Sequence, residues 1–271
     1  MEAILHWKHL KINLIFLIAL NLPNASFSQG WEIIDSLVVP YKISSYAIDQ
    51  EGKVYLGSLQ GDLYRYDNNW NEDKVFSGIN YSAVTTVEPW NRLKLFLFYR
   101  ENQSIVFMNR FILTPTELHL SALNIGFGNL ATIGVDNSYW ILESNFSELR
   151  KYSNKELLFA TPLGQIDLEH ASHMRAYQNL LILLDKKKGF YLFDQFGNKL
   201  SERSLEGASY FHIANKLIVT YDGNDVIEFN PFFHSEAKKI KGPLRPFKGV
   251  IKSGEEYLFI DDQRILKYRL K

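Results

Sequence analysis

The sequence predicts an all-β fold, a six-bladed β-propeller whose blades are four-stranded antiparallel sheets. The first reason is a unit of short strands and turns that recurs about every 40 residues, the period of a propeller blade. The second is that two different strands of this unit repeat in step. The third is an extra strand before the first repeat, matched by a last repeat that is one strand short.

The clearest copy of the unit is the segment 48–67, IDQEGKVYLGSLQGDLYRYD. Short apolar and aromatic runs, typical of strands, alternate in it with turns that contain glycine. We expect strands at 46–48, 54–56 and 63–66, joined by turns at 49–53 and 57–61. This arrangement is a β-meander.

Later copies of the unit are visible in its third and second strands. The third strand carries a large apolar or aromatic anchor in each copy, at Tyr66, Met108, Tyr152, Phe193, Phe229 and Tyr268. Subtraction gives spacings of 42, 44, 41, 36 and 39 residues. The second strands begin in the same register at Val54, Leu95, Tyr139, Leu181, Leu217 and Tyr257. Two independent registers therefore agree on six repeats.

The residue pattern of 48–67 resembles the blade repeat of the two-component-regulator propellers. That repeat runs roughly D-x-x-G-x-hydrophobic-hydrophobic-x-G-T…G-L-x-R-Y-D. The resemblance, close only in this first blade, implies a propeller fold. It also implies an extracytoplasmic binding role, because these propellers form bacterial sensor domains and the related NHL-like propellers are binding platforms. In later copies other residues, such as Phe98 and Glu143, replace Gly57.

The first 28 residues are predicted to be a signal peptide. Lys8, His9 and Lys11 form a basic region, 12–22 is an apolar run of 11 residues, and Ser26-Phe27-Ser28 supplies small residues for cleavage before Gln29. An uncleaved anchor is the alternative, but a bilayer span needs about 20 residues. We expect residues 29–271 to be one domain, exported to the periplasm, the cell surface or the medium, in a bacterial host.

The two ends of the mature chain are expected to meet in one blade. Residues 31–40 read as an isolated strand, and the last repeat stops at Lys271 directly after its third strand. If the N-terminal strand completes the last blade, the ring closes and no sheet edge is left open. The expected blades are Ile43–Gly78, Tyr81–Leu120, Asn129–Leu163, Ala171–Leu205, Tyr210–Ile240, and Phe247–Leu270 with the N-terminal strand.

Composition excludes several kinds of function. The chain has no cysteine, so it has neither a disulfide framework nor thiolate metal sites. Its 30 basic and 30 acidic residues give no electrostatic footprint for nucleic acid. We expect a monomer with no cofactor and no transmembrane segment after cleavage.

Catalytic and metal motifs are missing from the sequence. It contains no G-x-S-x-G, H-E-x-x-H, P-loop or G-x-G-x-x-G pattern. His170 and His173 are three apart, a spacing that places them on opposite faces of a strand. The segment 222–225, DGND, is typical of a hairpin turn. The sequence therefore predicts no metal site.

The candidate ligand site lies where propellers as a class place theirs, at the starts of the innermost strands and in the loops that lead into them. These segments offer mostly aromatic residues with a few polar ones, a composition suited to a peptide, a sugar face or an apolar ligand. They are Tyr46, Tyr81, Phe127, His170, His173, Tyr210, Arg245 and Phe247.

These observations favour a non-catalytic, extracytoplasmic propeller that binds a protein partner or an envelope or extracellular ligand. The alternative is a propeller enzyme with its site at the channel mouth, either a cation-dependent hydrolase similar to the lactonases or a lyase with His170 or His173 as base. A third hypothesis is a structural spacer in a surface assembly.

Overall fold

The computed structural model describes residues 30–91, 93–145, 147–164, 169–233 and 236–271. The predicted signal peptide, residues 1–28, lies outside these ranges. Residues 31–270 form one compact unit, which contains all the strands that the structure describes.

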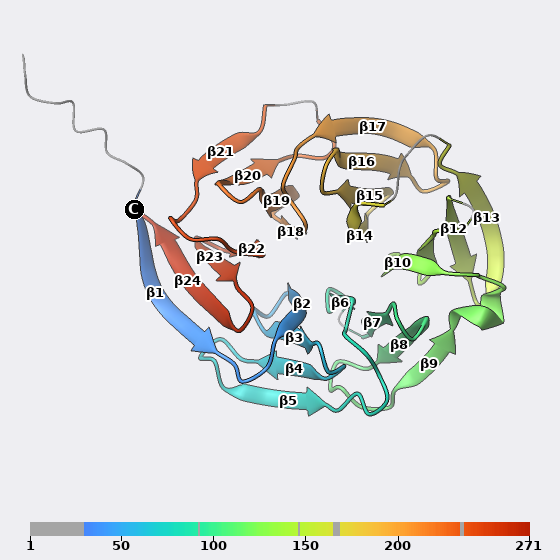
Figure 1. The fold of residues 1–271 in the computed structure, drawn as a ribbon, viewed down its shortest axis with the longest axis horizontal. Coiled ribbons are helices and arrows are strands. Elements are labelled where there is room, and N and C mark those ends of the chain that lie inside the picture. The colour runs from blue at the N-terminus through green and yellow to red at the C-terminus, as the bar shows by residue number, and fades with distance from the viewer. Residues whose placement is uncertain (1–29, 92, 146, 165–168, 234–235) are drawn as a thin grey trace, which may run out of the picture. The chain divides into compact units, whose positions relative to one another are not determined.

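This unit is a six-bladed β-propeller, as the sequence predicts. Six four-stranded antiparallel sheets follow one another around a ring, and in each sheet the first of its consecutive strands lies nearest the centre (Figure 1). Blades one to three consist of β2 (Ile43–Ile48), β3 (Val54–Ser58), β4 (Leu63–Tyr66), β5 (Glu72–Phe76); β6 (Thr86–Glu88), β7 (Leu95–Tyr99), β8 (Ser104–Met108), β9 (Thr116–His119); and β10 (Gly128–Ile133), β11 (Tyr139–Glu143), β12 (Glu148–Ser153), β13 (Glu156–Pro162). A short 3₁₀ helix, η1 (Leu120–Leu123), follows β9.

The remaining blades repeat the pattern. Blades four to six consist of β14 (Ala171–Tyr177), β15 (Leu180–Asp185), β16 (Gly189–Asp194), β17 (Lys199–Ser204); β18 (Phe211–Ala214), β19 (Leu217–Tyr221), β20 (Asp225–Phe229), β21 (Lys238–Lys241); and β22 (Gly249–Ser253), β23 (Glu256–Ile260), β24 (Arg264–Leu270), β1 (Trp31–Val38).

The N-terminal strand completes the last blade, which confirms the predicted ring closure. β1 pairs antiparallel with β24 from Trp31 opposite Leu270 to Val38 opposite Arg264. The indole of Trp31 packs edge-on against Tyr257, with ring centroids 5.1 Å apart. Its Nε1 donates a hydrogen bond of 2.6 Å to the carbonyl of Lys241 in blade five. β1 thus completes blade six and connects it to blade five.

The hydrophobic core lies between neighbouring blades. β3, β7, β11 and β15 are buried along their whole length, because sheets cover both of their faces. Phe96 and Phe98 of blade two, for example, share a cluster with Tyr139 and Ile141 of blade three. Aromatic-rich strands of neighbouring blades thus pack against each other, and this packing holds the blades around one axis.

Candidate functional site

A cavity lies at the end of the ring where the innermost strands finish. Its volume is about 480 Å³, within the range of small-molecule sites. All six blades line it through the turns between their first and second strands. We call this space the mouth cavity. It is defined by six lining residues, one from each blade: Gln50, Trp90, Val135, Arg175, His212 and Lys252.

Two charged side chains inside this end of the ring have unsatisfied polar atoms. Glu88, the last residue of β6, is 3% exposed, and its Oε1 has no hydrogen-bond partner among the described residues. Its other oxygen, Oε2, accepts a hydrogen bond of 2.7 Å from Nε1 of Trp90. Nε of Arg175 is buried and equally without a partner among these residues. Buried polar groups in this state are costly unless something else satisfies them.

Burial sets the protonation of the groups around Arg175. It raises the pKa of Glu88 to about 7, although the positive charge of Arg175 acts in the opposite direction. Burial also lowers the pKa of His212 to about 3, and here the charge of Arg175 adds to the effect. At neutral pH, His212 is therefore uncharged and Glu88 is near its midpoint.

The other charges that line the mouth cavity are held by partners in the fold. Nζ of Lys252 lies 2.8 Å from Oε1 of Glu228, which also accepts a hydrogen bond of 2.7 Å from Tyr257. Oδ1 of Asp49 accepts hydrogen bonds from two backbone amides of its own turn. Arg175 is thus the lining cation that makes no ion pair with the described residues.

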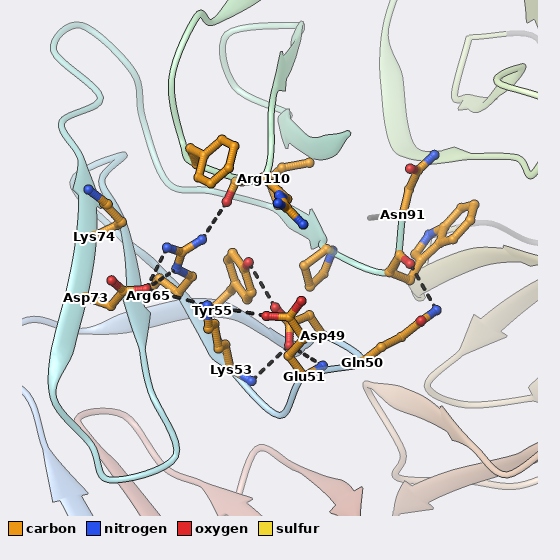
Figure 2. Close-up of a pocket in the computed structure, with 14 residues that line it drawn as sticks. Asp49, Gln50, Glu51, Lys53, Tyr55, Arg65, Asp73, Lys74, Asn91 and Arg110 are labelled. Atoms are coloured by element: carbon orange, nitrogen blue, oxygen red, sulfur yellow. Dashed lines mark hydrogen bonds and ion pairs between the residues drawn. The ribbon is translucent and has the colours of Figure 1, made fainter. Parts of the chain in front are cut away.

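A second cavity of about 440 Å³ opens between blades one and two and shares Asp49, Gln50 and Trp90 with the mouth cavity. Figure 2 shows that its charged walls are tied together. The guanidinium of Arg65 pairs with Asp73 at 2.6 Å and donates to the backbone carbonyl of Arg110. We call this space the side cleft; its lining residues are Asp49, Gln50, Glu51, Lys53, Tyr55, Arg65, Asp73, Lys74, Pro89, Trp90, Asn91, Leu95, Arg110 and Phe111.

Three of the eight site residues predicted from the sequence meet near the axis of the ring. Tyr210 lies against Tyr46 and His173, with ring centroids 4.3 and 4.7 Å away. Burial raises the pKa of both tyrosines and lowers the pKa of His173 to about 3. A side chain at Gly249 would collide with the hydroxyl group of Tyr46, so the packing here requires glycine.

The other five predicted residues do not join this group. Tyr81 stacks on Tyr99 at 4.2 Å, and Phe247 packs on Phe259 at 5.0 Å, both within the cores between blades. The remaining three precede inner strands and are half-buried or exposed: Phe127, His170 and Arg245. They lie at the starts of those strands, whereas the mouth cavity lies where the strands end.

Sequence reasoning missed Glu88, Arg175, His212 and Lys252. Each lies in the innermost strand of its blade: Glu88 ends β6, His212 is the second residue of β18, and the C-terminal halves of β14 and β22 hold Arg175 and Lys252. A signal was available, since a charged or imidazole side chain interrupts strands that are otherwise apolar or small, as Arg175 does in ASHMRAY. Charged residues in buried strands point to a functional site more sharply than aromatic residues do.

In the described ranges no three or more His, Asp and Glu side chains are grouped so that they could hold a metal ion. No helix among these residues is long and apolar enough to cross a membrane.

No protein-family model and no curated protein matches the chain. Among solved structures, a streptogramin B lyase is similar, with a TM-score of 0.62 and 11% identity over 89% of this chain and 98% of that one. Virginiamycin B lyase from Staphylococcus aureus has a TM-score of 0.60 and 11% identity over 89% and 100%. The WD40 domain of Pan2 from Neurospora crassa has 0.61 and 9% over 91% and 97%. At such identities the likeness shows the propeller fold alone.

Proposed function

We propose that this protein is an exported binding module that takes a ligand in the mouth cavity, with no covalent chemistry of its own. The observation that carries the proposal is a cavity built by all six blades around Arg175, a cation without an ion pair among the described residues. A concave site with a few convergent polar groups is the usual form of a ligand pocket. The side cleft extends it, so a ligand longer than the mouth cavity can continue past Trp90.

Export is supported by the sequence of residues 1–28, with its basic region, apolar run and small residues. The mature protein would then meet its ligand in the periplasm, at the cell surface or outside the cell. N-terminal sequencing of the protein purified from its native host tests this. A first residue of Gln29 is expected, and a protein that retains Met1 would contradict it.

Binding at the mouth cavity is tested by blocking it. Val135 lines the cavity and is 59% exposed, so Val135→Trp can place an indole there without disturbing the core. Leu244 precedes β22 at the other end of the ring and is 98% exposed, which makes Leu244→Trp the matched control. Ligands found by a broad fragment screen with ligand-observed NMR should bind the control normally and the Val135→Trp variant at least about tenfold more weakly. Equal binding to both variants would place the ligand elsewhere and refute the proposal.

An enzyme is the second candidate function, and one observation favours it. A carboxyl group with a pKa of about 7 beside a cavity is suited to general acid or base catalysis at neutral pH. Two of the structures with a similar fold are lyases. Turnover of a bound ligand that disappears in Glu88→Gln while binding persists would favour this candidate over a pure binding module.

A further inference from the structure

We propose that the ligand of the mouth cavity is a small organic carboxylate, that Arg175 supplies its counter-charge, and that Glu88 competes with the ligand for Arg175 when it is ionised. This inference rests on the proposed function and names the ligand class that the site would accept.

Arg175 carries the charge that the ligand would meet in the mouth cavity. It comes from β14, lines the cavity, and makes neither an ion pair nor a hydrogen bond through Nε within the described residues. A guanidinium group with its Nε buried and without a partner is destabilising, and a carboxylate can satisfy two of its N–H groups at once. A bound carboxylate would therefore supply what the fold leaves open.

The groups around Arg175 set the net charge that a ligand meets. The titratable groups that face Arg175 are Glu88 from β6, His173 from its own strand, His212 from β18 and Tyr210, which directly precedes β18. Both histidines are neutral near pH 7, because burial lowers the pKa of each to about 3. Tyr210 also stays uncharged there, since burial raises its pKa.

The lining charges outside this group cancel or are already engaged. Lys252 from β22 is paired with Glu228, and Asp49 accepts the amides of its own turn. When Glu88 is protonated, the available charge is thus close to plus one, which matches a singly charged carboxylate. A doubly charged phosphate group would place an excess negative charge beside Glu88.

Glu88 makes the affinity of the site depend on pH. Protonated Glu88 is neutral, and its Oε1 side has no partner among the described residues. Ionised Glu88 repels a second carboxylate in a site of low dielectric. Because burial raises the pKa of Glu88 to about 7, the affinity for the carboxylate should fall as the pH rises through neutrality. If the protonated form alone binds, the loss between about pH 6 and pH 8 is about tenfold.

The experiment uses matched probes on residues 29–271. Benzoate and N-acetylphenylalanine are the carboxylates, and their primary amides are the neutral controls. Isothermal titration calorimetry or ligand-observed NMR at about pH 6 should show each carboxylate binding at least about tenfold more tightly than its amide. Arg175→Gln should remove this preference, and Arg175→Lys should retain part of it.

Two further variants test whether carboxylate binding depends on the charged groups of the mouth cavity or on exposed arginines in general. Glu88→Gln should bind the carboxylates but lose the pH dependence, because the competing group no longer titrates. Arg245→Gln removes an exposed arginine that precedes β22, and the carboxylates should bind this control as they bind the wild type.

The outcomes distinguish this inference from the proposed function. Amides that bind as well as carboxylates, and that Val135→Trp blocks, would overturn the carboxylate assignment while the binding module stands. Tighter binding of inorganic phosphate than of the carboxylates would also overturn it. If no carboxylate probe binds the folded wild-type protein at millimolar concentration, the inference fails, whereas the proposed function depends on the broader screen.

Discussion

Glu88 provides the sharpest quantitative test of the structure, through the pH dependence of stability. Its ordinary pKa is 4.5, and burial raises it to about 7 in the folded protein. A carboxyl group whose folded pKa is raised carries no penalty below about pH 4.5. The penalty grows as the pH rises from about 4.5 to about 7, because ionisation is easier in the unfolded chain, and it is constant above the folded pKa. At about 1.36 kcal/mol per pH unit the full cost is about 3 kcal/mol, of which about 2.5 kcal/mol arises between pH 5 and pH 8.5.

Glu88→Gln removes this titration and keeps an oxygen that can accept the hydrogen bond from Trp90. The difference in unfolding free energy between the variant and the wild type should therefore shift in favour of the variant by about 2.5 kcal/mol from pH 5 to pH 8.5. Urea denaturation followed by tryptophan fluorescence measures it, with a check that the m-value is unchanged. A difference that stays constant across this range would refute the reasoning that burial raises the pKa of Glu88.

Three further predictions follow from the same core. His212 should destabilise the protein by about 2 kcal/mol at pH 5, because burial lowers its pKa from 6.5 to about 3 and stability is lost as the pH falls below 6.5. His212→Gln should remove this loss of stability at acid pH in the same urea assay. Trp31→Ala should lower the unfolding free energy by about 2 to 3 kcal/mol, because it removes the indole that joins blades five and six. Ile34→Ala, at a position on the same strand that is 37% exposed, should lower it by well under about 2 kcal/mol. Equal effects of the two substitutions would contradict the role of Trp31 in closing the ring. Gly249→Ala should lower the unfolding free energy by about 1 to 3 kcal/mol, because the added methyl group meets the Tyr46 hydroxyl. In a double-mutant cycle Tyr46→Phe should recover part of this loss, and strictly additive effects would argue against the contact.

The fold could be predicted from the sequence because its signal is repeated. Each blade buries its middle strands on both faces, so each copy carries the same apolar runs, and small deviations in spacing do not hide them. The need to cover a free sheet edge then assigned the N-terminal strand to the last blade, although its partner is distant in sequence.

The candidate site could be predicted only in part, because it has no repeat. Each blade contributes a different residue to the mouth cavity, and a periodic search averages such differences away. Aromatic residues such as Tyr81 and Phe247 serve the cores between blades, while Tyr46 and Tyr210 face the axis. The sequence does not distinguish these two environments, since both favour the same side chains. Arg175 becomes conspicuous only when its place in the mouth cavity and its unpaired Nε are known.

The closing strand concentrates the long-range part of folding in a single event. Every other strand pair joins neighbours along the chain, whereas β1 must find β24 across about 230 residues. Topology of this kind slows folding, because the entropy of closing a large loop is lost before the contacts that compensate it are made. Blades one to five can each form from strands that are close in sequence, but the ring cannot close until β24 has folded and can pair with β1. A circular permutant that links Leu270 to Trp31 and opens the chain between two other blades would make this pairing local and transfer the slow step to the new opening.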